Sequence, residues 1–572
     1  MRRLRRWMIG LVGAVAAAAG LGCASRAEWS LLEPPTVAPE WTDISVDPRE
    51  RDPSLYWDAV HQSSFYLLEQ SLDLPRQLRK LTGRMHEAVN ADVFGEIPNS
   101  SWFTHRHGRT RLSRDELQRG PNRIAGPDTA GVWTITRAKT EGVTPGFFIK
   151  DAAGETFILK FDPAAHPELA TGAEMISTKL FHAFGYHVPE NYLVTFDPAR
   201  LVIRDGLQVK DSRGRQYPFT REELERVLAK VARRPDGTIR AVASRLLPGA
   251  PIGPFSYKGV RRDDPNDRVP HEHRRELRGL KIFAQLTNHF DTKDHNSLDV
   301  VVEEDGRRFV RHYLIDFGST LGSDGDEPKS VYKGYAYVLD LEQALVSLVT
   351  LGLRRWAWEE ADPRGIPAAV GYFESDLFDP PGWKPLHANP AFDNMTHADA
   401  FWACRILSQF TEDDLRACVE TAAYSDPAAT EYLVRHLWVR RNKILAYYYA
   451  KTSPLDAFTL DDTGDSVTLR FVDRVIADGV GEGGAMEYRW SLDRVAGRLG
   501  SQEGVASAPI VVLDDTVRSR LVAVASNSGA GRERVFRLDI TPRRAGAKAC
   551  SVYLYLDPVP NLFRIVGLDR PS

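Results

Sequence analysis

The chain has 572 residues, of which 43% are hydrophobic and 26% are charged, and its formal net charge is −3. That hydrophobic content is enough for two or three separate cores, which excludes a disordered chain. The near-neutral charge gives no sign of a basic nucleic-acid-binding face, so we expect no nucleic-acid partner.

The N-terminus has a basic start followed by an apolar run. Residues 1–6 contain four arginines, and residues 7–22 are rich in Ala and Gly but too short for a comfortable membrane span. The run ends at Gly20-Leu21-Gly22-Cys23, which resembles a bacterial lipoprotein signal. The resemblance implies a signal peptide over 1–22 and a lipidated Cys23, which would anchor an exported protein on the periplasmic side of the inner or outer membrane. An ordinary secretory signal and an uncleaved anchor are the alternatives, and both also export the chain.

Two segments of different composition follow. Residues 23–54 are rich in Pro, Glu and Asp and are predicted to be a linker from the lipid anchor. Residues 55–130 are predicted to be a helical and loop extension. Within it, apolar residues recur at helical intervals over 55–90, with a break at Asp73-Leu74-Pro75.

From residue 131 the pattern changes to short strands, predicted at 132–135, 147–150 and 156–161. A Gly-containing turn joins the second and third of these strands, which indicates a hairpin. A helix over 168–184 and a strand over 191–196 complete a small, mostly β unit at 131–196. Residues 197–270 are polar and mixed in charge, and they are predicted to be an insertion with one short helix at 221–232.

The loop that follows the predicted helix 272–288 carries the strongest chemical signal. Asp291 and Asn296 lie five positions apart in that loop, and Asp316-Phe317-Gly318 follows the second strand of a predicted hairpin, 297–302 with 309–315. The hairpin is expected to direct the Asp316 carboxylate back at the loop. Two carboxylates and a carboxamide that converge would bind magnesium, a hard cation that prefers oxygen. The alternative is that these residues are helix caps and turn residues.

The order Asp-x-x-x-x-Asn and then Asp-Phe-Gly resembles the active site of the protein-kinase-like superfamily. The histidine in the loop and the strand pair before Asp316 are most similar to the HipA-type and phosphoinositide 3-/4-kinase-like branches. The resemblance implies ATP and Mg²⁺ as cofactors and an acceptor hydroxyl on an unknown protein, lipid or small molecule. It makes Asp291 the catalytic base, Lys293 a charge-compensating residue, and Asn296 and Asp316 the metal ligands.

Upstream residues extend the same resemblance. Gly142-Val143-Thr144-Pro145 is similar to the Gly-x-x-Pro loop of HipA-type proteins, which implies that Gly142 and Thr144 contact the nucleotide. Lys160, at the end of a strand, would hold the phosphates, and Glu174 on the next helix would pair with it, with Glu168 as the alternative. Strand 192–196 is then expected near the hinge and the adenine. Transfer of AMP in place of phosphate stays open.

Residues 271–453 are predicted to form a larger helical lobe, with further helices at 339–351, 398–410, 412–421 and 428–451. From residue 454 to 572 the pattern has period two, which predicts a β-sandwich-like domain. Its predicted strands are 467–471, 488–492, 510–513, 521–526, 535–540, 552–556 and 563–566. Three widely spaced cysteines, Cys404, Cys418 and Cys550, exclude a disulfide framework and are expected to be buried free thiols, with one Cys404–Cys418 bridge as the alternative.

These observations predict an α+β protein with a bilobal kinase-like fold, followed by the β-sandwich-like domain. Its small lobe is mostly β and its larger lobe is helical. The expected function is an ATP- and Mg²⁺-dependent phosphotransferase of the bacterial cell envelope, with a nucleotide and an unknown acceptor as partners. A catalytically inactive kinase-fold lipoprotein that binds or scaffolds at the envelope is the alternative, because the periplasm holds little ATP.

Overall fold

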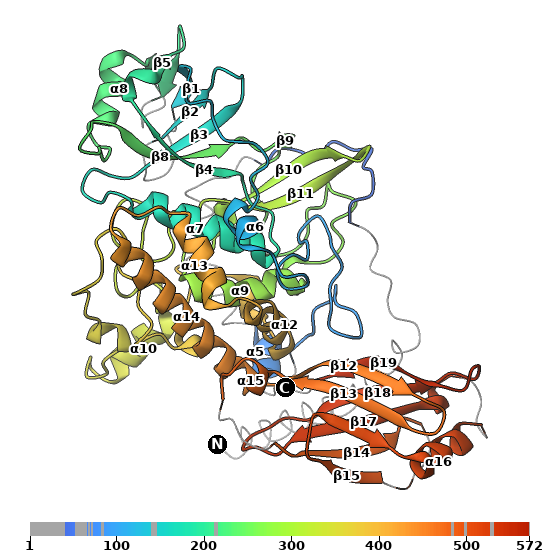
Figure 1. Ribbon diagram of the computed structural model, residues 1–572. Helices are drawn as coiled ribbons and strands as arrows, with labels where there is room; N and C mark the ends of the chain where they lie inside the picture. The colour runs from blue at the N-terminus through green and yellow to red at the C-terminus, as the bar shows by residue number, and fades with distance from the viewer. Residues whose placement is uncertain are drawn as a thin grey trace, which may run out of the picture.

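The computed structural model describes residues 40–51, 66, 69, 73–81, 85–138, 146–210, 215–481, 486–496, 500, 502–526 and 531–570. It contains a β-rich lobe, a helical lobe and a C-terminal pair of β-sheets (Figure 1). The expected α+β architecture with two lobes and a C-terminal β domain is therefore confirmed. Within these residues, no helix combines the length and the apolar character that a membrane span requires.

The small lobe is built on a six-stranded sheet of order β4-β8-β3-β2-β1-β5. Large apolar side chains such as Trp133, Phe147 and Phe157 fill its core with almost no exposure. Beneath the sheet lies α7 (Leu169–Phe184), whose Phe181 and Phe184 belong instead to the core of the helical lobe. The strands are β1 (Trp133–Ala138), β2 (Gly146–Lys150), β3 (Thr156–Phe161), β4 (Asn191–Phe196), β5 (Leu201–Ile203) and β8 (Ile239–Arg245).

The segment 197–270, predicted to be an insertion, contributes an interior strand to this sheet, second from one edge. Strand β8 pairs with β3 on one side and with β4 on the other. Its Ala241, Val242 and Ala243 are completely buried, as residues of an interior strand are. The same segment also holds α8 (Arg221–Leu228), the pair β6 (Gln208–Lys210) and β7 (Gln216–Pro218), and β9 (Ala250–Pro251).

The helical lobe packs around α9 (Arg275–Thr287), which is buried over almost its whole length. Helices α12 (His397–Ser408), α13 (Glu412–Glu420) and α14 (Pro427–Tyr449) begin at side-chain caps on Thr396, Thr411 and Asp426. The antiparallel pair β10 (Ser297–Glu304) and β11 (Arg307–Leu314) follows α9, as predicted. Helices α10 (Leu341–Val349) and α11 (Pro390–Asp393) complete the lobe. Cys404, Cys418 and Cys550 are buried free thiols, so no Cys404–Cys418 bridge forms.

The N-terminal extension runs along the helical lobe. Its helices are α5 (Leu74–Leu81) and α6 (Arg114–Arg119), and residues 85–90 are not helical, unlike the prediction for 55–90. Residues 40–51 follow the β10–β11 pair, where the Ile44 amide donates to the Arg308 carbonyl at 2.8 Å. The predicted signal peptide, Cys23 and most of 52–72 lie outside the described residues.

The C-terminal domain consists of two sheets that share one core. One sheet has the order β12-β13-β16, and the other has the order β15-β14-β17-β18-β19. Residues 521–526, predicted to be a strand, belong instead to helix α16 (Asp515–Ser526). The strands are β12 (Leu455–Asp462), β13 (Val467–Asp473), β14 (Tyr488–Arg494), β15 (Gln502–Ala506), β16 (Ile510–Leu513), β17 (Val535–Pro542), β18 (Cys550–Leu556) and β19 (Phe563–Asp569).

Candidate active site

Lys160 joins the two lobes through a pair of carboxylates. Its ammonium lies 3.0 Å from Glu174 Oε1 on α7 and 3.0 Å from Asp316 Oδ1 after β11. Burial lowers the pKa of Lys160, but Asp316 and Glu174 outweigh burial and raise this pKa above its ordinary value. The group is therefore a fixed positive charge between the lobes.

Glu174 is held rigidly in this arrangement. Its side chain is only 2% exposed, and the Asn191 amide donates to Glu174 Oε1 at 3.0 Å. The alternative partner, Glu168, faces elsewhere: it lies 3.6 Å from Arg240 and accepts a hydrogen bond from the Ser425 hydroxyl. The structure thus pairs Lys160 with Glu174 and not with Glu168.

The loop after α9 forms a compact group around Asp291. Lys293 Nζ lies 2.9 Å from Asp291 Oδ2. The Asn296 amide nitrogen donates to the Asp291 carbonyl at 2.6 Å and to Asp291 Oδ2 at 3.0 Å. The loop starts at Asn288, whose left-handed backbone (φ 48°) ends α9 and whose Oδ1 accepts a 2.8 Å hydrogen bond from the Trp383 indole. These contacts fix the direction of the Asp291 carboxylate.

Asp316 reaches the site because the next residue is pinned. Phe317 is fully buried, and its ring packs 4.8 Å from that of Phe181 on α7. Asp316 itself has a left-handed backbone (φ 64°), a conformation uncommon for a residue other than glycine, and its side chain is 50% exposed. Backbone strain of this kind is found at sites where the surrounding structure imposes the conformation.

One cavity brings these residues together. It has a volume of about 120 Å³, and Lys160, Glu174, Asp291, Lys293 and Asp316 all line it. Asn296 is adjacent through its bonds to Asp291 but does not line the cavity. Gly142 and Thr144 lie outside the described residues, as Cys23 does.

Three residues that line the cavity were not predicted from the sequence. Val242 on β8 and Thr171 on α7 line the cavity, as does Asp324, which is ion-paired to Lys333. The strand expected near the adenine, β4, is at the edge of the sheet, whereas β8 lies beside Lys160. Asp324 falls in a Gly- and Ser-rich stretch that is typical of a turn, and β8 carries no polar motif, so the sequence held no signal for either.

The residues present fit a magnesium ion bound together with phosphates. Within the described residues, Asp291 Oδ1 and Glu174 Oε2 are buried acceptors without a hydrogen-bond partner. The nitrogen of the Asn296 amide is directed at Asp291, so its oxygen is the atom that the side chain can offer a cation. No group of three His, Cys, Asp or Glu side chains is arranged around a metal position in the described ranges. Mg²⁺ usually binds one or two carboxylates plus substrate phosphates, which suits this partial set.

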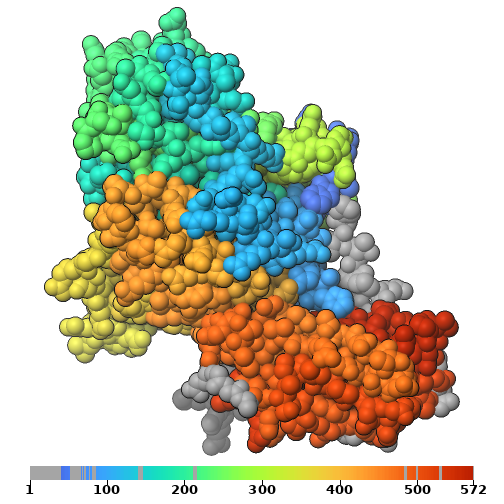
Figure 2. Space-filling view, viewed as in Figure 1, coloured from blue at the N-terminus to red at the C-terminus, as the bar shows by residue number. Residues whose placement is uncertain are grey.

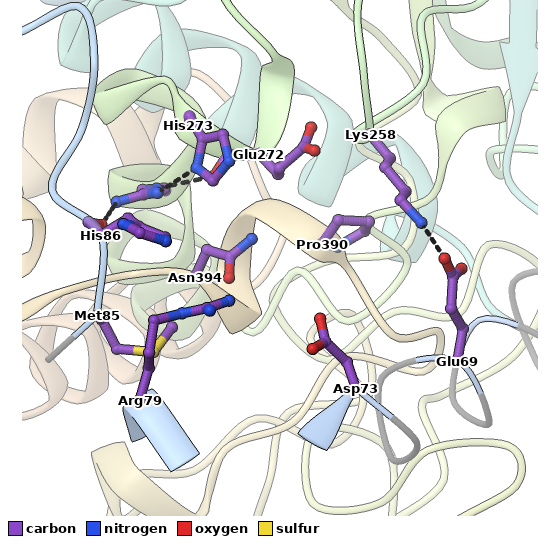
Figure 3. Close-up of a pocket in the computed structure, with 11 residues that line it drawn as sticks. Glu69, Asp73, Arg79, Met85, His86, Lys258, Glu272, His273, Pro390 and Asn394 are labelled. Atoms are coloured by element: carbon purple, nitrogen blue, oxygen red, sulfur yellow. Dashed lines mark hydrogen bonds and ion pairs between the residues drawn. The ribbon is translucent and has the colours of Figure 1, made fainter. Parts of the chain in front are cut away.

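A second cavity, of about 260 Å³, lies where the N-terminal extension meets α9 (Figure 3). Two of its cationic groups contact neighbouring lining residues: Lys258 pairs with Glu69 at 2.5 Å, and Arg278 lies 2.7 Å from His273 Nδ1. Arg278 also donates to the carbonyl of His86 at 2.8 Å. These contacts join the extension to the helical lobe and indicate a structural role.

No protein-family model matches the chain. No curated protein matches it either. Among solved structures, eight chains match. One is the Helicobacter pylori proinflammatory kinase CtkA, with 12% identity and a TM-score of 0.28, over 56% of this chain and 97% of that chain.

The Golgi casein kinase also matches, with 10% identity and a TM-score of 0.28, over 72% of this chain and 94% of that chain. Its structure with Mn/ADP bound matches with 11% identity and a TM-score of 0.30, over 71% of this chain and 91% of that chain. Likenesses at these TM-scores are too weak to assign a function to this chain.

Proposed function

We propose that this protein is a kinase-like phosphotransferase that moves the γ-phosphoryl group of ATP to an acceptor hydroxyl. One observation carries the proposal: Lys160 from the small lobe, Glu174 from α7 and Asp316 after β11 meet in the cavity that Asp291 and Lys293 also line. Segments far apart in the sequence thus converge on the set of charges that phosphoryl transfer requires.

Asp291 and Lys293 supply the acceptor side of the reaction. Asn296 orients the Asp291 carboxylate through Oδ2, and Oδ1, which has no hydrogen-bond partner among the described residues, can accept a hydrogen bond from the attacking hydroxyl. The Lys293 ammonium, 2.9 Å from Oδ2, is placed to compensate the charge of the phosphoryl group as it moves. Positioning and electrostatics provide most of the catalysis in such reactions.

Lys160 and Asp316 supply the nucleotide side. Asp316 is half exposed and can bind a cation in place of Lys160. The Lys160 ammonium, still held by Glu174, is then free to contact the phosphates. Asp316 and Asn296 would hold Mg²⁺, which when bound neutralises charge on the phosphate oxygens.

The proposed location is the bacterial cell envelope, with the protein exported and anchored through a lipidated Cys23. The resemblance of residues 1–23 to a lipoprotein signal supports this location. The acceptor is a protein, lipid or small molecule that reaches the same compartment. Mass spectrometry of the modified product distinguishes phosphoryl transfer from AMP transfer by the added mass.

A catalytically inactive envelope scaffold is the second candidate, and the sizes of the cavities favour it. The cavity at Lys160 holds about 120 Å³, below the roughly 300–1,000 Å³ of common ligand pockets. A hollow of about 790 Å³ lies instead beside β4, where Asn122, Lys179 and Tyr192 are among the lining residues. A scaffold could bind its partner there without any need for the charges around Lys160.

The two candidates differ in their response to nucleotide. Thermal unfolding of the full chain is measured with ATP and Mg²⁺, with ATP and a chelator, and without ligand. A nucleotide at a hundredfold excess over its Kd would stabilise the protein by about 2.7 kcal/mol, which raises Tm by several degrees. We expect this rise only with Mg²⁺, and we expect its loss in Asp316→Ala.

The matched control is Asp465→Ala, an exposed aspartate between β12 and β13 of the C-terminal domain. This variant should respond to MgATP as the unmodified chain does. If no nucleotide shifts the Tm of the unmodified chain, the phosphotransferase is rejected in favour of the scaffold.

A further inference from the structure

Helix α10 exposes its apolar stripe. Leu341, Leu345, Leu348 and Val349 lie on one face at helical spacing, and they are 42%, 61%, 71% and 74% exposed. A surface helix normally turns this stripe toward the core. No residue of α10 is buried, so the helix contributes little to the fold in its present position.

The stripe continues on both sides of the helix. Val338 and Leu339 before it are 57% and 40% exposed, and Leu351 and Leu353 after it are each 85% exposed. These eight side chains, which we call the apolar face, belong to a segment that projects from the helical lobe, in yellow at the left of Figure 2. Large apolar side chains that are exposed together in one segment in this way mark an interaction surface.

The charges around the apolar face favour a lipid surface. Asp340 and Glu342 are engaged by Lys384, at 2.9 and 3.2 Å. Arg354 and Arg355 come directly after Leu353, and within the described ranges no ion pair involves either of them, although Arg354 lies 5.4 Å from the centre of the Trp356 ring. Exposed leucines beside arginine and tryptophan are typical of segments that lie in the membrane interface, where arginine contacts anionic headgroups.

Three acidic residues, Glu359, Glu360 and Asp362, follow after Trp356 and lie farther from the leucines along the chain. Glu359 turns back and accepts a 3.2 Å hydrogen bond from the Trp356 amide, and Asp362 is paired with Arg364 at 2.6 Å. Glu360 is exposed, but it lies farther along the chain than Arg354 and Arg355, which directly follow Leu353. The charge nearest the C-terminal end of the apolar face is therefore that of the two arginines.

The apolar face is also connected to the candidate active site. The Val338 amide donates to the Leu386 carbonyl at 2.8 Å, and the Leu386 amide donates to the Phe290 carbonyl at 2.8 Å. Phe290 directly precedes Asp291. Two backbone hydrogen bonds therefore link the start of the apolar face to the residue beside the proposed base.

We propose that the apolar face inserts into the interface of a lipid bilayer, with Arg354 and Arg355 on anionic headgroups. This surface goes beyond the proposed function and does not depend on it. A second copy of the chain or a protein partner would also cover the leucines, and the test below distinguishes these occupants from a bilayer.

The test places a dye at the apolar face of the full chain. In a Cys23→Ala background, Leu348→Cys is labelled with an environment-sensitive fluorophore, because the other three cysteines are buried. The control label is at Val512→Cys on β16, which is 53% exposed. Vesicles of phosphatidylglycerol and phosphatidylethanolamine should shift the emission at position 348 to the blue and raise it several-fold, and should leave position 512 unchanged. Brominated lipid should quench the signal at 348.

Variants then test the two parts of the proposal. Leu345→Glu with Val349→Glu, labelled at 348, should lose the vesicle-dependent rise without a change in Tm, because both side chains are exposed. Arg354→Gln with Arg355→Gln should remove the preference for phosphatidylglycerol over phosphatidylcholine; an equal response to both lipids in the unmodified chain overturns the role of the headgroups.

Insertion of the apolar face is overturned if vesicles do not change the emission of the label at position 348, whether or not the chain floats with them. A lipid-free rise that grows with protein concentration also overturns it, in favour of a second copy.

Discussion

The charge of Lys160 depends on a balance between burial and its two carboxylates. Burial lowers the pKa of this ammonium, whereas Asp316 and Glu174 raise it, and the carboxylates prevail. A raised folded-state pKa stabilises the fold below the unfolded value of about 10.4. That stability is lost as the pH rises through the folded-state pKa. Lys160 therefore stays charged at neutral pH, as a phosphate-binding residue must.

Removal of the Lys160 charge should show how much an unpaired, buried Glu174 carboxylate destabilises the fold. Lys160→Met leaves Glu174, at 2% exposure, without its counter-charge, so we expect a loss of about 3–5 kcal/mol in the free energy of unfolding. Urea denaturation measures the loss. Lys160→Met with Glu174→Gln should recover part of it, because the uncompensated charge is then absent.

The matched control is Lys150→Met, an exposed lysine at the end of β2, which should change the stability by no more than about 0.5 kcal/mol. A loss in Lys160→Met no larger than that of the control contradicts the pairing.

At the scale of elements, local pattern and tertiary packing differ in what they determine. Strands β1 to β4 and helices α7 and α9 lie close to their predicted positions because their apolar spacing is regular. Residues 521–526 alternate in a way that favours a strand, yet they form the end of α16. Asp514 caps this helix by accepting a 3.0 Å hydrogen bond from the Val517 amide, and Leu521 and Ala525, four positions apart, face the core.

Helix α7 contains a glycine that packing requires. A Cβ on Gly172 would lie 2.4 Å from the Tyr424 hydroxyl oxygen. Although alanine is favoured over glycine inside a helix by roughly 0.5–1 kcal/mol, we expect Gly172→Ala to destabilise the protein by about 1–3 kcal/mol through overpacking. Thermal unfolding measures this.

The double variant Gly172→Ala with Tyr424→Leu removes the obstructing ring and should be more stable than Gly172→Ala with the ring present. If Gly172→Ala alone raises Tm, α7 has room to move and the close packing against Tyr424 is refuted.

At the scale of the whole molecule, the C-terminal β domain is joined to the helical lobe through Asp456 at the start of β12. This buried carboxylate lies 3.3 Å from Arg405 on α12, 2.9 Å from Arg474 and 3.5 Å from Arg570. Arg570 also lies 4.6 Å from the centre of the Phe401 ring. Burial raises the pKa of Asp456, but the three arginines outweigh burial and lower this pKa below its usual range.

Loss of this carboxylate should uncouple the domain. A lowered folded-state pKa stabilises the fold above the unfolded value of about 3.9. The stability is lost as the pH falls below that value and through the folded-state pKa. Asp456→Asn should abolish this acid-dependent part and cost about 3–5 kcal/mol at neutral pH, because three partly buried arginines lose the buried carboxylate that they share. We expect calorimetry to resolve two transitions in place of one.

Asp557→Asn, which removes the exposed pair with Arg564 at 3.0 Å, is the control and should keep a single transition. One unchanged transition in Asp456→Asn contradicts the role of the carboxylate as the link.

The sequence alone determined the residues whose spacing is local. Asp291, Lys293 and Asn296 share one loop, and a hairpin of regular alternation leads to Asp316, so their meeting was predictable. The choice of Glu174 over Glu168, the interior place of β8 and the approach of Asp324 depend on contacts between segments remote in sequence. Only the tertiary structure decides such contacts, because the packing of the lobes, and not any short pattern, fixes which side chains share a cavity.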